Sequence, residues 1–230
     1  MMTYIALSLY LTTYLFFSLI YLINIRTFKN VAGESFSFLR HFPFELDEDK
    51  RNDRHFFLRA AIILIIPLMC ASYVLILKDI YPLTSLAYIM TISGALSYVL
   101  LFFLFIIDTK YVNVHLTLFL LFALTCVINA ISAIWQAFLF IDSTLYISIL
   151  FNDVIGYVIA VFGFIILATE VVILVNPKIK NWAKLEKHVN EDGTIIYKRP
   201  KIFILALSEW LLIALNHLSF ILPLILFLCL

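Results

Sequence analysis

Six stretches of the chain consist almost entirely of apolar residues, and each is longer than twenty residues. Because an α-helix rises about 1.5 Å per residue, about 20 such residues cross the apolar core of a bilayer, which is about 30 Å thick. The stretches cover residues 3–24, 57–77, 83–107, 114–141, 146–175 and 202–225. We therefore expect an all-α, polytopic membrane protein in which residues 1–230 form a single transmembrane domain, a bundle of about six helices.

The composition excludes the main alternatives. Hydrophobic residues make up 64% of the chain and charged residues 13%, whereas soluble domains average about 45–50% and about 25%. A membrane β-barrel would show short segments of alternating polarity in place of continuous apolar runs. The first run is not typical of a signal peptide, because no Lys or Arg precedes it and it is longer than the usual apolar region of about 7–15 residues. The net charge of +1 gives no basis for nucleic acid as a partner.

The distribution of Lys and Arg predicts the orientation, since the cytoplasmic loops of membrane proteins are enriched in these residues. The two long links, residues 25–56 and 176–201, contain thirteen of the sixteen basic residues. Lys110 falls on the same side of a six-helix arrangement, whereas the opposite side has Lys78 alone. We therefore expect both links in the cytoplasm and both termini outside it, in a cell membrane.

The long links also show patterns that are typical of the membrane surface. Residues 36–46 interleave phenylalanines with basic residues, a composition favoured in the headgroup region. In residues 178–189, apolar residues recur at three- and four-residue spacing with lysines between them, which predicts an amphipathic helix in the interface. Its membrane-surface residues are Trp182, Lys184, Leu185 and Lys187, with the lysines facing anionic headgroups. A helix that binds a protein partner or a second copy of the chain would show the same pattern, so these partners stay open. A turn at Asp192 and Gly193 and an extended segment at 194–197 follow.

Ionisable residues inside membrane helices are costly, and by default they mark a function or a partner. The polar residues that we expect to line a ligand or ion pathway are Arg59, Asp153, Glu170, Glu209, Asn216 and His217. By depth, Arg59, Glu170 and Glu209 form an inner layer near the cytoplasmic helix ends, and the others lie in the outer half. We expect Glu209 to be buried and Arg59 to pair with an inner carboxylate, because pairing neutralises both charges out of water. Alternatively, Arg59 extends alone to the interface.

Small and polar residues gather on single faces of two helices, as they do at helix–helix contacts in lipid. At about 100° per residue, the packing stripes comprise Asn152, Gly156 and Gly163 in the fifth run and Asn129, Ser132 and Gln136 in the fourth. We expect close, hydrogen-bonded packing along these faces. A cavity between them, filled with water or ligand, is the alternative.

The sequence does not select one function. It lacks the HExxH, GxSxG and Walker motifs, and no two of its five histidines stand at the spacing of metal ligands on a helix, so we expect no catalytic residues, metal or cofactor. Three classes of function stay open: binding or transport of a small molecule, ion or lipid through the bundle, a sensor or assembly module that acts through the basic links, and an intramembrane lipid-modifying enzyme. A wet cavity between the polar stripes would favour the first, a dry core the second, and a pocket open to lipid the third.

Overall fold

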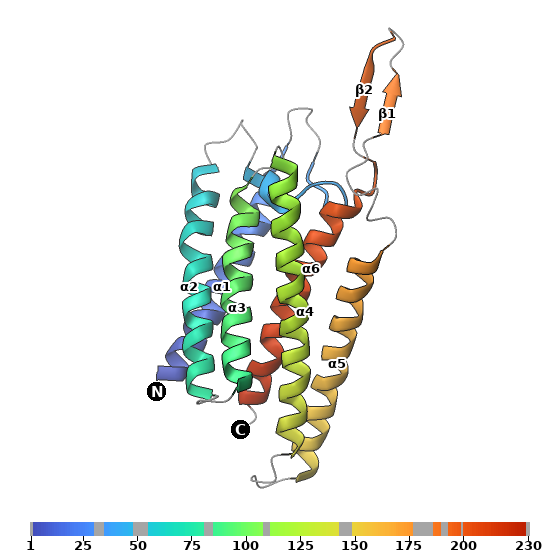
Figure 1. Ribbon diagram of the computed structural model, residues 1–230. Helices are drawn as coiled ribbons and strands as arrows, with labels where there is room; N and C mark the ends of the chain where they lie inside the picture. Colours follow the sequence, from blue (N-terminus) through green and yellow to red (C-terminus); the bar gives the residue numbers. More distant parts are fainter. Residues whose placement is uncertain are drawn as a thin grey trace.

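The computed structural model describes residues 2–29, 35–47, 55–80, 85–107, 111–142, 149–176, 186–189, 193–198 and 200–228. These residues form six long α-helices: α1 (Met2–Thr27), α2 (His55–Ile80), α3 (Ser85–Ile106), α4 (Val112–Asp142), α5 (Ile149–Val175) and α6 (Ile204–Leu228) (Figure 1). The predicted all-α membrane bundle is confirmed. Each helix begins and ends within a few residues of its apolar run, because the bilayer thickness sets the length of both.

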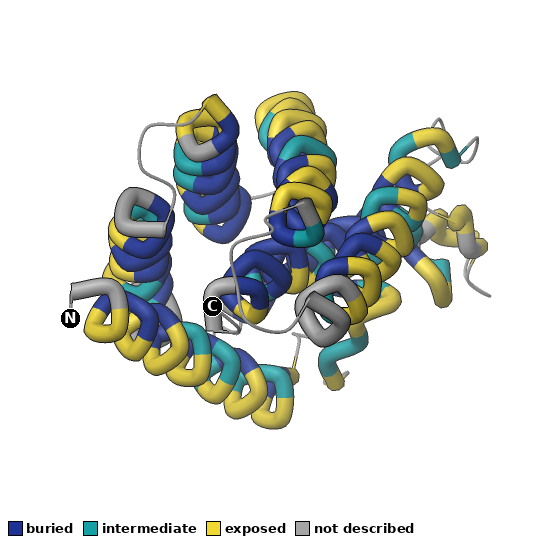
Figure 2. Tube along the Cα trace, turned by 90° about the horizontal axis from the view of Figure 1, so that it is seen from below, coloured by how far each residue is buried: buried dark blue, intermediate teal, exposed yellow. Residues whose placement is uncertain are grey.

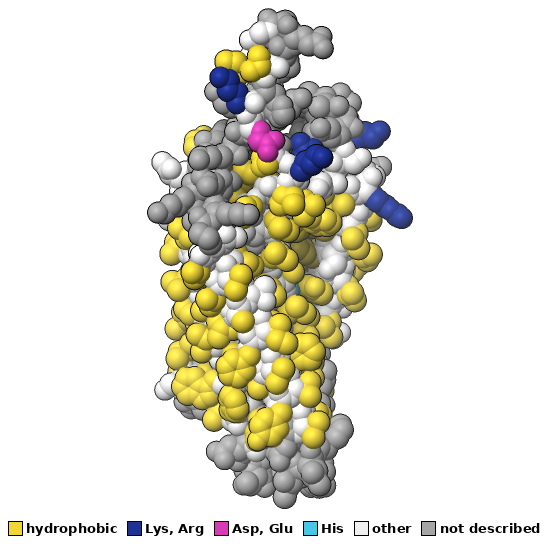
Figure 3. Space-filling model, turned by 90° about the vertical axis from the view of Figure 1, so that its right-hand side faces the viewer, with side chains coloured by type: hydrophobic (Ala, Val, Ile, Leu, Met, Phe, Trp, Pro, Cys, Tyr) yellow, Lys and Arg dark blue, Asp and Glu magenta, His cyan; other side chains and the backbone are white. Residues whose placement is uncertain are grey.

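In the described residues, α1, α3, α4, α5 and α6 contain apolar spans of 19 to 29 residues, each long enough to cross a membrane. The described side chains of α2 add a shorter apolar stretch, Ala61–Leu77. Large apolar side chains cover the sides of the bundle, whereas basic side chains lie beyond the end of this apolar surface (Figure 3). A surface of this kind requires lipid as its solvent. The chain is a helical membrane protein.

The helices are arranged as an arc that encloses α6 (Figure 2). Each of α1 to α5 packs against the next in the sequence, and α6 packs against α4 and α5. Aromatic side chains fill the space between α6 and the earlier helices: Phe220 lies 4.4 Å from Tyr73 and 5.1 Å from Tyr98, measured between ring centroids. The start of α1 and the end of α6 lie at the same end of the bundle, opposite the long links (Figure 1).

Glycines on α5 allow it to approach α4 closely. A Cβ atom built on Gly156 would lie 2.4 Å from the Ile141 side chain, and one built on Gly163 would lie 2.6 Å from the Ile134 side chain. Such distances are far inside van der Waals contact, so only glycine fits without a shift of its neighbour. The predicted stripe on α5 therefore faces a neighbouring helix at these two positions, while the side chain of Asn152 lies outside the described residues.

The first long link folds back onto the end of the bundle. Its described residues include a short 3-10 helix, η1 (Pro43–Asp47), which packs against α2, α3 and α6. Phe42 and Leu46 are buried, whereas Phe38 and Leu39 stay exposed. The expectation that the whole segment 36–46 lies against the membrane is therefore wrong for Phe42 and Leu46, because the open end of the bundle offers them an apolar protein surface.

The predicted helix over 178–189 is wrong at its end. Glu186–Val189 form a strand, β1, which pairs antiparallel with β2 (Ile195–Lys198), so that the predicted extended segment is half of a hairpin. Gly193 in the connecting segment has a φ of +79°, a left-handed conformation that glycine adopts without strain. The hairpin projects beyond the end of the bundle (Figure 1). Lys187 lies on β1, and the other three membrane-surface residues, Trp182, Lys184 and Leu185, lie outside the described residues.

Candidate functional site

A buried pair of ionisable side chains joins α4 to α6. His115 Nε2 lies 3.1 Å from Glu209 Oε2, and both side chains are almost completely shielded, with exposed fractions of 2% and 0%. The prediction that Glu209 is buried is confirmed. Its partner here is His115, and the side chain of the expected partner, Arg59, lies outside the described residues. No pattern in the sequence predicts this pairing, since the two residues are separated by 94 positions.

Hydrogen bonding fixes where protons can lie in this pair. His115 Nδ1 is 3.1 Å from the backbone oxygen of Ile107, and a carbonyl oxygen can only accept, so Nδ1 carries a hydrogen. The contact between Nε2 and Glu209 then needs one further proton, which lies on the carboxyl group or on the imidazole ring. In both cases the pair has no net charge. The pair therefore holds one shared proton without net charge, and the buried Glu45 is close enough to interact electrostatically with Glu209.

The first long link covers this pair from the end of the bundle. The Phe42 ring lies against the His115 ring, with 5.6 Å between centroids and an interplanar angle of 78°. The backbone N–H of Phe42 donates to the Glu45 carboxylate at 2.8 Å, and Glu45 is itself buried. This hydrogen bond fixes Phe42 over the pair. The link therefore separates the His115–Glu209 pair from the aqueous side.

Glu170 on α5 is a second buried carboxyl group, and it has an exposed fraction of 0%. Neither of its oxygens has a hydrogen-bond partner among the described residues, and the same holds for Glu209 Oε1. Cys126 on α4 is close enough to interact with it electrostatically, and the Cys126 thiol donates to the Leu212 oxygen of α6 at 3.9 Å. Glu170 thus lies where α4, α5 and α6 meet. An unpaired carboxylate in such a place is very costly, so the group is neutral unless a ligand or water reaches it.

A hydrogen-bonded network joins α3, α4 and α6 deeper in the bundle. Asn129 accepts from Ser93 Oγ at 2.6 Å and donates to Asn216 Oδ1 at 3.0 Å. Asn216 in turn donates to Ser97 Oγ at 3.4 Å. The sequence placed Asn129 in a packing stripe and Asn216 in a pathway, whereas the structure brings them into one buried network.

The other two polar residues of the α4 stripe are also buried. Ser132 Oγ donates to the backbone oxygen of Ile128 in its own helix at 2.7 Å. The Gln136 amide nitrogen contacts the Met90 sulfur of α3, and its amide oxygen has no partner among the described residues. These contacts face α3 and the interior of the arc, so this stripe belongs to the protein interior.

His217 on α6 lies among aromatic rings. Its Nδ1 donates to the backbone oxygen of Ile213 at 2.7 Å, and its Nε2 has no partner within the described part of the chain. Ring centroids of Tyr14, Tyr98 and Phe17 lie 5.2, 6.3 and 6.4 Å away. The structure therefore keeps His217 apart from the His115–Glu209 pair. Asp153, the remaining outer residue, lies on α5, and its side chain is outside the described residues.

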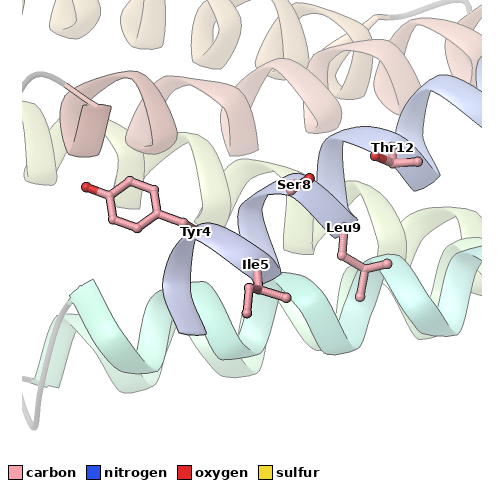
Figure 4. Close-up of a pocket in the computed structure, with 5 residues that line it drawn as sticks. All are labelled: Tyr4, Ile5, Ser8, Leu9 and Thr12. Carbon is pink, nitrogen blue, oxygen red and sulfur yellow. The ribbon is translucent and has the colours of Figure 1, made fainter. Parts of the chain in front are cut away.

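An open groove of about 520 Å³ runs along α1, lined by Tyr4, Ile5, Ser8, Leu9 and Thr12 (Figure 4). Tyr4, Ile5 and Leu9 are exposed apolar side chains on the outer face of the bundle. In Figure 4, Ile5 and Leu9 point the same way from the helix, and Ser8 and Thr12 lie on the other side. All lining residues come from one helix that faces lipid, so the groove does not connect the buried polar groups.

Neither a metal-binding arrangement of side chains nor similarity to known proteins indicates what this site does. Among the described residues, no three His, Cys, Asp or Glu side chains are placed to hold a metal ion. Comparison with protein-family models, with curated proteins and with solved structures found no match.

Proposed function

We propose that the protein binds protons inside the membrane and transfers them through the helix bundle, alone or coupled to the movement of a small solute. The observation that carries this proposal is the buried His115–Glu209 pair, in which the hydrogen bond to Ile107 leaves one proton to be shared between a ring nitrogen and a carboxyl oxygen. A pair that holds a single proton carries no net charge, whereas a second proton or a vacant site would leave a charge in the apolar interior, so uptake and release of the proton must follow each other closely.

Glu170 supports the same function as a second proton-binding group. Of the four carboxyl oxygens of Glu170 and Glu209, three have no partner among the described residues. A buried polar atom without a hydrogen-bond partner destabilises the folded protein by about 1–3 kcal/mol. A role in helix packing alone does not explain why these carboxyl groups are present. Water or a solute that reaches these oxygens during transport would satisfy them. By contrast, we assign the Asn129–Asn216 network to helix packing, because its members satisfy one another.

Proton flux into liposomes tests the proposal. The purified protein is reconstituted with an internal pH-sensitive dye, and a potassium diffusion potential drives protons inward. We expect flux above that of empty liposomes, and its loss in Glu209→Gln, because glutamine cannot release a proton. Glu186→Gln, which removes a carboxylate from the exposed hairpin, is the matched control and should leave the flux unchanged. The absence of flux above empty liposomes, or equal flux in Glu209→Gln, would overturn the proposal.

A second candidate function is that of an assembly module that binds other protein chains through the hairpin. The hairpin projects beyond the bundle, and the paired residues Val189 and Ile195 are 64% and 51% exposed. Adjacent apolar side chains on a small sheet fit a protein surface. Val189→Ser combined with Ile195→Ser should then lower the mass of the assembled complex in detergent while proton flux persists. An unchanged mass would refute this candidate.

A further inference from the structure

The end of the bundle that bears the hairpin also carries an aromatic cluster, formed by Phe28, Phe36, Phe38, His41 and Trp210. The ring centroids of Phe38 and Trp210 lie 5.0 Å apart. Trp210 Nε1 donates to the His41 backbone oxygen at 2.9 Å, and the Phe203 backbone N–H donates to the Leu39 oxygen at 2.6 Å. These two hydrogen bonds attach the first long link to the start of α6. Three segments that are distant in the sequence thus form one surface.

Basic residues from all three segments flank the aromatic cluster. Arg26 lies in the last turn of α1, two residues before Phe28. Arg40 directly follows Leu39 in the first link, and Lys201 stands two residues before Phe203, so the Leu39–Phe203 hydrogen bond brings together the backbone segments that carry these two residues. Basic side chains are visible at the edge of the apolar surface, at the end with the hairpin (Figure 3). This edge is the level of phospholipid headgroups.

Exposed apolar side chains lie beside these cations. Phe38, Leu39 and Ile202 are 45%, 43% and 54% exposed, although each is next to a buried or hydrogen-bonded segment. Along α6, Leu211 and Leu218 are also exposed, and because they are seven residues apart they lie on one face of the helix, within its membrane span. A water-soluble anion would gain nothing from these apolar residues, whereas an amphiphile would contact both kinds of side chain.

We propose that this surface binds an anionic phospholipid. Arg26, Arg40 and Lys201 hold its phosphate, and its acyl chains lie against Phe38, Ile202 and the exposed strip of α6. Guanidinium groups suit phosphate because they donate two parallel hydrogen bonds, and aromatic rings such as those of the cluster are favoured at headgroup depth. The bound lipid also stabilises the first link, whose Phe42 covers the His115–Glu209 pair. This proposal does not depend on proton transfer.

Trp210 is a built-in probe of this surface. With Trp135→Phe and Trp182→Phe, Trp210 is the single tryptophan, and phospholipids brominated near the headgroup quench its fluorescence on contact. We expect a brominated anionic lipid to quench at lower concentration than a brominated zwitterionic lipid. Because each basic residue near an anionic surface contributes a factor of about 5, Arg26→Gln combined with Lys201→Gln should weaken the association of the anionic lipid about 25-fold.

The control removes a charge from the same end of the molecule but from outside the proposed surface. Lys187→Gln, on the exposed β1, should leave the quenching curve unchanged. Equal quenching by anionic and zwitterionic lipids would overturn the proposal. The proposal would also be overturned if Lys187→Gln weakened the association of the anionic lipid as much, per charge removed, as the double variant does. That result would show that the lipid responds to a diffuse surface potential and not to a site. Unchanged helix content by circular dichroism establishes that the double variant is folded.

Discussion

Substitution of Glu209 tests whether His115 and Glu209 share a proton. Glutamine has the size of a protonated glutamate, and its amide can donate to His115 Nε2 while Nδ1 keeps its bond to Ile107. The buried hydrogen bond is therefore retained in Glu209→Gln, and we expect the free energy of unfolding to fall by less than about 1 kcal/mol. Glu209→Leu instead removes the buried hydrogen bond between the carboxyl group and Nε2, which costs about 1–3 kcal/mol.

Thermal unfolding distinguishes these outcomes. For a chain of this length, about 1 kcal/mol corresponds to about 2–4 °C in Tm, so Glu209→Leu should lower Tm by about 2–12 °C and Glu209→Gln by less than about 4 °C. Cys126 is buried, so a thiol-reactive dye added to the protein in detergent reports its exposure on unfolding. Infrared difference spectra across a pH step should show a carboxyl band that is absent from Glu209→Gln.

Two results would refute this reasoning. If Glu209→Gln destabilised the protein as much as Glu209→Leu, the amide would not replace the carboxyl group, and the shared proton would lie on the imidazole ring as part of an ion pair. If Glu209→Leu left Tm unchanged, Nε2 would have another partner or access to water, and the buried pair could not be the proton site.

Three further predictions concern packing and orientation. Gly163→Val should destabilise the protein by about 1–3 kcal/mol, because its Cβ would overlap the Ile134 side chain of α4. The control, Ala168→Val on the exposed face of α5, should change Tm little. Equal effects of the two substitutions would show that α5 does not pack through Gly163. Asn216→Leu should lower the free energy of unfolding by about 1–3 kcal/mol, because the Asn129 amide loses its acceptor. Adding Asn129→Leu should recover part of this loss in a double-mutant cycle. Strictly additive effects of the two substitutions would argue against the network. In a variant without native cysteine, Lys187→Cys should react with an impermeant thiol reagent only from the cytoplasmic side; labelling from outside would reverse the predicted orientation.

The sequence by itself determined the class of fold and the number of helices. Apolar runs longer than twenty residues fix a membrane helix wherever they occur, because the bilayer thickness and the need to satisfy every backbone hydrogen bond act on each run separately. The burial of Glu209 follows in the same way, since a short charged side chain deep in an apolar run cannot face lipid. These are properties of single segments, so no knowledge of their neighbours is needed.

Only the tertiary structure decided which polar groups meet. The partner of Glu209 depends on how α4 and α6 are rotated and tilted against each other, and that choice placed His115 beside it, 94 residues away in the chain. The same dependence joined Asn129 to Asn216 and left Glu170 without a partner among the described residues. At 186–189 the sequence favoured a helix, but pairing with 195–198 produced a strand. In each case the outcome depended on contacts between distant segments, which spacing along one segment does not encode.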